Sequence, residues 1–192
     1  MRDFIWICMK KALWFLWLVF VVSACDGNDR TGVQSHTIAD QSPVFKVTVE
    51  VQAAQDDTFA LYYTTDGSID FSSIKPVWAK IKGSPKPQKV VFKLPQKVVP
   101  TELRIDLGQN PDQREIYLQK IWMSYHGKAV EFPGTLIFSY FRPDFNKTEI
   151  NATTGMVRGI VKKGVKQSPS LYPKAVDGPL HEQILKLTAT EN

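Results

Sequence analysis

The feature that most constrains the fold of this chain is a strict alternation of apolar and polar residues that begins near position 44. In residues 44–52, VFKVTVEVQ, every second side chain is apolar: Phe45, Val47, Val49 and Val51. Successive side chains of a β-strand point to opposite faces of a sheet, so one face of this segment is expected to be buried. The segment is therefore predicted to be a half-buried β-strand.

Further segments with strand-like patterns follow at short intervals. We expect strands in TFALYYT, VWAKIK, KVVFKLP, LRIDL, EIYLQKIWMSY, KAVEF, TLIFSYF, GMVRGIV and QILKLTA. EIYLQKIWMSY is apolar on both faces, which predicts a central strand or a strand with a bulge. Twelve prolines and eleven glycines punctuate the runs, and no segment longer than a turn or two has a clear helical period. This pattern predicts an all-β fold, an antiparallel β-sandwich or barrel.

A different pattern marks the first 24 residues. Lys10 and Lys11 precede residues 12–24, which are apolar or small throughout. A secretory signal needs about 7 to 15 apolar residues and a membrane-spanning helix about 20, so we interpret residues 1–24 as a signal peptide. The sequence from Met9, MKKALWFLWLVFVVSAC, reads as a complete signal, and we hypothesise that translation begins there.

The end of this signal, VSAC at 22–25, resembles the lipobox of bacterial lipoproteins. The resemblance implies that a peptidase cuts before Cys25 and that this cysteine carries palmitate-type lipid. Cleavage also removes Cys8, so acylation accounts for a thiol that would otherwise stay unpaired after export. Asp26 resembles the signal that retains enteric-type lipoproteins in the inner membrane, facing the periplasm. An ordinary signal peptide with a chance cysteine is the alternative.

The segment after the cleavage site is polar and lacks any period. We predict a lipidated cysteine and flexible tether over 25–43, followed by one β-sandwich domain over 44–192. Removing residues 1–24 takes away three basic residues and one acidic residue, which lowers the formal net charge from +5 to +3. So mild an excess, without a basic run and in an exported chain, argues against a nucleic-acid partner.

The order of segments within 58–125 is similar to that of galactose-binding-like jelly-roll modules. The segments are FALYYTTDGSIDF, VVFKLP and PTELRIDLGQNPDQREIYLQKIWM. The similarity is closest to modules in bacterial envelope sugar-transfer proteins, whose Leu-Arg-Ile-Asp-like and Ile-x-x-Ile-type strands match 103–107 and 116–122. The resemblance implies a jelly-roll that binds or orients saccharide without catalysis. The family's calcium loop is not recognisable, because Asp66 and Asp70 lack a dense run of oxygen donors.

Saccharide recognition needs flat apolar rings and planar polar groups that bond to hydroxyls. Trp78 lies on the polar face of its predicted strand, and Arg104 and Asp106 lie on the outward face of LRIDL. Tyr140 and Arg142, in SYFRPDF, stand at the end of a predicted strand. We predict ligand contacts from these five residues. The alternatives are a tryptophan covered by a loop, a cross-strand Arg104–Asp106 ion pair, and a strand end packed under a loop.

No motif for catalysis, a metal or a cofactor is recognised, and none of the three is predicted. His126 and His181 lack metal-ligand spacing, and Gly-x-Ser-x-Gly is absent. The sequence thus predicts a noncatalytic lipoprotein that is held in the bacterial cell envelope by membrane lipid on Cys25 and binds an envelope or extracellular saccharide. The alternative is a structural or assembly subunit that pairs with an envelope membrane protein through a sheet face.

Overall fold

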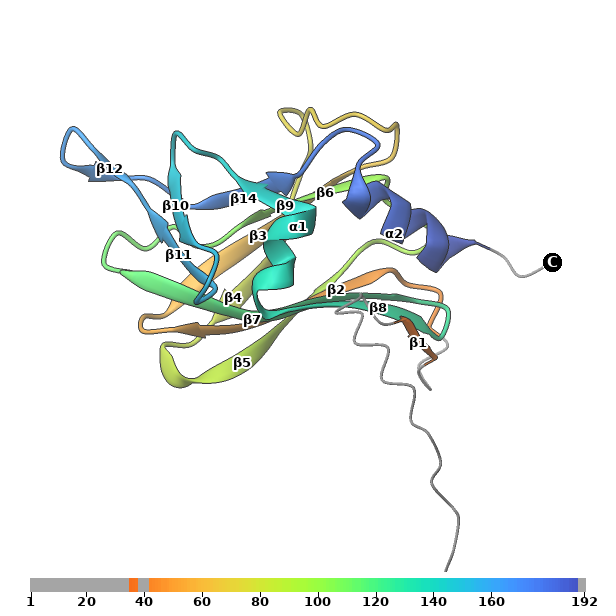
Figure 1. The fold of residues 1–192 in the computed structure, drawn as a ribbon, viewed down its shortest axis with the longest axis horizontal. Coiled ribbons are helices and arrows are strands. Elements are labelled where there is room, and N and C mark those ends of the chain that lie inside the picture. Colours follow the sequence, from red (N-terminus) through yellow and green to blue (C-terminus); the bar gives the residue numbers. More distant parts are fainter. Residues whose placement is uncertain (1–34, 38–41, 190–192) are drawn as a thin grey trace, which may run out of the picture. The chain divides into compact units, whose positions relative to one another are not determined.

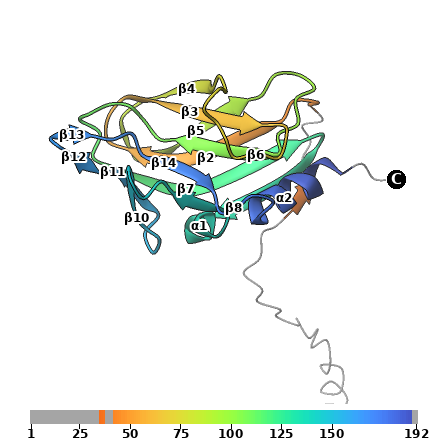
Figure 2. The same ribbon diagram turned by 90° about the horizontal axis from the view of Figure 1, so that it is seen from above.

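Two antiparallel β-sheets pack face to face in the computed structural model, which describes residues 35–37 and 42–189 (Figures 1 and 2). All of these residues belong to one compact unit, Val33–Asn192. The predicted all-β, antiparallel sandwich is confirmed. Its expected jelly-roll connectivity stays a prediction.

The seven-stranded sheet is built around two long central strands, β2 and β7. Its members are β1 (Ser35–Thr37), β2 (Lys46–Ala53), β5 (Ser84–Lys93), β7 (Glu115–Tyr125), β8 (Lys128–Pro133), β10 (Thr148–Asn151) and β11 (Met156–Gly159). β2 pairs with β5 and β7, and β7 also pairs with β8 and β11. The register of β2 with β7 shifts between Glu50 and Val51. β7 is therefore a central strand, as predicted, and its pairing is also irregular.

The five-stranded sheet has the strand order β4-β3-β6-β14-β9. Its members are β3 (Asp57–Thr64), β4 (Val77–Ile81), β6 (Glu102–Asp106), β9 (Phe141–Pro143) and β14 (Ser170–Pro173). A separate hairpin of β12 (Val161–Lys162) and β13 (Val165–Lys166) projects from one end of the sandwich (Figure 1). Lys163 and Gly164 form its tight turn, with φ of 50° and 77°, as two-residue hairpin loops require.

The core lies between the two sheets and is built largely from strand side chains that alternate inward. Each is at most 4 % exposed, and the removal of this apolar surface from water stabilises the fold. The predicted inward residues are confirmed for three strands: Phe45, Val47, Val49, Val51, Val90, Phe92, Leu94, Leu103, Ile105 and Leu107.

The segment TLIFSYF is not a strand, which corrects the prediction for 135–141. It forms a 3-10 turn, η1 (Gly134–Leu136), and a short helix, α1 (Ile137–Tyr140), before β9 begins. Gly134 has φ of 50°, a conformation that favours glycine, and it redirects the chain directly after β8. Ile137 and Phe138 are adjacent and both buried, which a half-buried strand does not allow.

The segment QILKLTA is also helical, and its prediction as a strand was wrong. It belongs to α2 (Pro179–Thr188), which has a proline in its first turn. The buried residues of α2 are Leu180, Ile184 and Leu187, which follow the helical spacing of four and three. α2 contacts β6 of one sheet and β7 and β8 of the other, so it covers an open side of the sandwich (Figure 2).

The N-terminal segments lie mostly outside the described residues. The signal peptide, Cys25 and Asp26 are among them. Within the predicted tether, residues 35–37 form β1, which pairs antiparallel with β8. No helix in 35–37 or 42–189 combines the length and the apolar character needed to cross a membrane.

Substitutions in α2 test this correction. Ile184→Ala and Leu187→Ala should each lower the free energy of unfolding by about 2–5 kcal/mol, because both side chains are removed from the core. Leu185→Ala, at a side chain that is 54 % exposed, should change it by about 0.5 kcal/mol or less. Urea denaturation measures all three. In a strand, residues 185 and 187 would share one face and residue 184 would lie on the other. Equal losses of unfolding free energy in Leu185→Ala and Leu187→Ala would therefore contradict the helix.

Candidate functional site

The outer face of the five-stranded sheet carries alternating tyrosine and arginine side chains. Tyr62 on β3 pairs with Arg104 on β6, and Tyr172 on β14 pairs with Arg142 on β9. The register of β14 with β6 places Tyr172 beside Arg104. These four residues lie side by side across neighbouring strands, and we call them the Tyr–Arg row.

The members of the Tyr–Arg row stack on one another. The guanidinium carbon of Arg104 lies 4.7 Å from the ring centroid of Tyr62 and 4.7 Å from that of Tyr172. The guanidinium carbon of Arg142 lies 5.4 Å from the centroid of Tyr172. A cation near an aromatic ring face is attracted by the ring quadrupole, so these contacts hold the row in place.

Arg104 also forms a fork with Asp106, two residues further along β6. Its Nε donates to Oδ1 at 2.8 Å and its Nη2 donates to Oδ2 at 2.7 Å, and both side chains are 16 % exposed. Burial disfavours the charged guanidinium, but the hydrogen bonds and charge of Asp106 raise the pKa of Arg104 overall. The pair is an ion pair within one strand, and the carboxylate of Asp106 is held in a fixed orientation.

The loop between β3 and β4 covers part of this face. Phe71 from the loop is 3 % exposed and meets Tyr172 edge to face, with ring centroids 5.9 Å apart. Asp66 and Asp70 shape the loop, because each accepts a hydrogen bond from the backbone N–H two residues later. Their carboxylates therefore act as turn formers in this loop.

Trp78 lies at the edge of the same sheet face. It pairs with Ala60 of β3, whose other partner is Asp106, so one strand separates the indole from the carboxylate. At a strand spacing of about 4.8 Å, the Cα atoms of Trp78 and Asp106 lie roughly 10 Å apart. Trp78 is 49 % exposed and Ala60 is 1 % exposed. The indole is thus open to water, whereas the Ala60 side chain between it and Asp106 is covered.

Tyr140 lies away from this face. Its ring contacts Phe132 of β8, with centroids 4.4 Å apart, and burial raises the pKa of its hydroxyl. The structure therefore brings four of the five predicted ligand residues to one sheet face and places Tyr140 elsewhere. Tyr62 and Tyr172 also lie on this face but were not predicted. In each case an apolar inward residue precedes the tyrosine, and this alternation could have placed the tyrosine outward.

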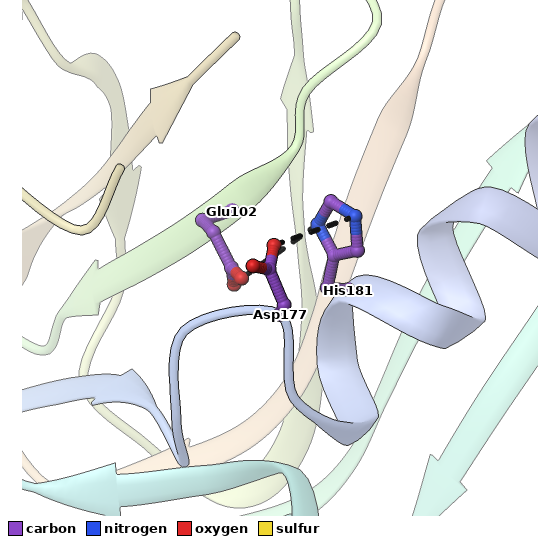
Figure 3. A group of neighbouring side chains, drawn as sticks. All are labelled: Glu102, Asp177 and His181. Atoms are coloured by element: carbon purple, nitrogen blue, oxygen red, sulfur yellow. Dashed lines mark ion pairs between the residues drawn. The ribbon is translucent and has the colours of Figure 1, made fainter. Parts of the chain in front are cut away.

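A second polar group, the Glu102 cluster, consists of Glu102, Asp177 and His181 (Figure 3). Glu102 begins β6, Asp177 precedes α2, and His181 lies in the first turn of α2. His181 Nδ1 is 3.7 Å from Glu102 Oε1, and its Nε2 is 3.9 Å from Asp177 Oδ1. The four-residue spacing of Asp177 and His181 was the only sequence signal, because Glu102 is distant in the chain.

The carboxylate of Glu102 is buried with little compensation. Its side chain is 0 % exposed, and neither oxygen accepts a hydrogen bond from any residue that the structure describes. Burial raises the pKa of Glu102 from 4.5 to about 7. His181 and the nearby backbone N–H of Asp177 act against this shift, while the charge of Asp177 adds to it. These three residues form a group that could hold a metal ion.

A hollow of about 520 Å³ lies between the β7–β8 turn and the end of α2. Its lining residues are Val99, Tyr125, His126, Lys128, Leu187, Thr188 and Ala189. None of the five predicted ligand residues lines it. The candidate ligand surface is therefore distinct from this hollow.

Comparison with known proteins gives no match: no family model, no curated protein and no solved structure is significantly similar to this chain. The assignment of function therefore depends on the residues and their geometry.

The buried carboxyl of Glu102 predicts an unusual pH dependence of stability. Because its folded pKa of about 7 exceeds its ordinary 4.5, the folded state binds more protons between these values, and stability falls as pH rises. With a chelator present, the loss from pH 4.5 to 8 should approach about 3 kcal/mol. Glu102→Gln should remove this slope and be the more stable form at pH 8. Urea denaturation across pH measures both; parallel pH profiles would contradict the assignment.

Proposed function

We propose that the protein is a membrane-anchored, noncatalytic lipoprotein that binds an envelope or extracellular saccharide on the outer face of its five-stranded sheet. The observation that carries the proposal is the half-exposed indole of Trp78 on the same face as the Arg104–Asp106 fork. The C–H face of a sugar ring stacks on a flat aromatic ring, while oriented polar groups bond to the hydroxyls.

The fork supplies the polar part of this surface. Each oxygen of Asp106 accepts one hydrogen bond from Arg104 and retains a second acceptor site for a ligand hydroxyl. Because Arg104 is held between Tyr62 and Tyr172, the carboxylate needs little ordering when a ligand binds. In this proposal Trp78 provides the apolar contact and Asp106 the polar one, with Arg142 at the far end of the row.

The anchor in this proposal is lipid on Cys25. The supporting observation is the VSAC sequence at the end of the signal, with Asp26 as the retention signal for the inner membrane, facing the periplasm. Several acyl chains on one cysteine hold a protein at a membrane stably, whereas a single chain does so only marginally.

A glycan array tests the saccharide surface. Trp78→Ala should weaken binding by roughly tenfold or more, because the variant loses the stacking ring. Phe145→Ala is the matched control, since Phe145 is 74 % exposed and follows β9 at the opposite edge of the sheet. Circular dichroism should show that both variants fold. Equal glycan binding by the wild type and Trp78→Ala would remove Trp78 from the surface.

Metabolic labelling with palmitate tests the anchor. The wild-type protein should be labelled and should fractionate with membranes, whereas Cys25→Ser should be unlabelled and leave the membrane fraction, because the acylated side chain is absent. An unlabelled wild-type protein would contradict the lipoprotein assignment.

A second candidate function is that of a structural or assembly subunit of an envelope complex. The observation that favours it is the exposed apolar side chains at and near the projecting β12–β13 hairpin: Val161 at 64 %, Val165 at 62 % and Phe145 at 74 %. Such side chains suit contact with another protein when they gather in one region. Crosslinking in membranes separates the candidates, because a stoichiometric protein partner without glycan binding favours this second function.

A further inference from the structure

The Glu102 cluster has the negative charge of a cation site but no cation among its neighbours. The buried carboxylate of Glu102 points toward Asp177 and His181, and both of its oxygens lack a hydrogen-bond partner among the described residues (Figure 3). Within 35–37 and 42–189, no lysine or arginine forms an ion pair with Glu102 or Asp177. A buried carboxylate is normally paired or bound to a metal ion.

The three side chains offer converging donor atoms from two separate elements. One ligand atom from each residue lies within 4.8 Å of the other two. Donor atoms around a four-coordinate zinc ion lie roughly 3.3 Å apart, so a side-chain adjustment of up to about 1.5 Å would complete the set. Two carboxylates and a neutral imidazole also carry the charge that a divalent cation neutralises.

The orientation of His181 fits a metal ligand. Its Nδ1 lies 3.0 Å from the backbone carbonyl oxygen of Thr101, which can only accept a hydrogen bond. A neutral ring that donates from Nδ1 has its lone pair on Nε2, the nitrogen that faces Asp177 at 3.9 Å. Metal-ligating histidines commonly donate their second N–H to a backbone carbonyl in this way.

The donor set favours one class of cation. Imidazole nitrogen together with carboxylate oxygen suits zinc and similar transition-metal ions, whereas calcium requires six to eight oxygen ligands and magnesium prefers oxygen and water. Asp177 is 73 % exposed, so the cluster is open to water on one side. That side gives the ion a route of access and a water molecule as fourth ligand.

We propose that Glu102, Asp177 and His181 bind a divalent cation of the zinc class, which ties the first turn of α2 to the start of β6. The ion compensates the buried carboxylate and fixes the helix whose apolar residues cover the open side of the sandwich. The proposal does not depend on saccharide binding.

Calorimetric titration of the metal-free full chain with ZnCl₂ tests the proposal. Wild-type protein should bind one zinc ion at this site with micromolar or tighter affinity, and its Tm should rise by several degrees, because only the folded state holds the complete ligand set. Ca²⁺ and Mg²⁺ should give smaller shifts at equal concentration. Absence of a Tm rise with saturating zinc would overturn the proposal.

Variants assign the ion to the cluster. Glu102→Gln preserves the side-chain shape without the charge, and it should weaken zinc binding at least tenfold, as should His181→Ala. His126→Ala is the matched control, because His126 is exposed in the β7–β8 turn. This variant leaves both cysteines and the other histidines unchanged. Cobalt substitution gives a second readout, since the visible absorption of a tetrahedral site should disappear in Glu102→Gln. Unchanged zinc affinity in both cluster variants would overturn the assignment.

Discussion

The burial of one face of each strand between the two sheets is the interaction on which the rest of this structure depends. A β-strand places alternate side chains on opposite faces, so Leu103 and Ile105 can enter the core only if Arg104 and Asp106 face outward. The outer polar face is therefore a direct consequence of the inner apolar one. A one-residue shift in register would exchange the two sets and place the fork in the core.

The same constraint leaves an open side that the strands alone do not close. α2 covers it because Leu180, Ile184 and Leu187 share one helical face. The segment that leads into α2 passes over the start of β6, where it brings Asp177 and His181 to Glu102. The surroundings of the buried Glu102 carboxylate are thus set by α2 and the segment before it, which also complete the core.

The sequence predicts strands well where the alternation is long, and poorly where it is short. In residues 44–52 the apolar residues keep a period of two over the whole segment, which no helix reproduces. In QILKLTA the apolar residues are too few to distinguish the two periods, and Leu180, which completes the helical set, lies outside the segment. In TLIFSYF three apolar residues follow one another, so the segment has no period of two, and the adjacent Ile137 and Phe138 are both buried in the helix.

The sequence by itself determined the β class, the inward residues of the long strands, and the outward placement of Trp78, Arg104 and Asp106, because alternation is a local property of the strand. Only the tertiary structure decided which strands are neighbours. Strand order stacks Arg104 between Tyr62 and Tyr172, and it buries Glu102, which local alternation places among the outward side chains. These outcomes depend on contacts between residues far apart in the chain, which no local pattern specifies.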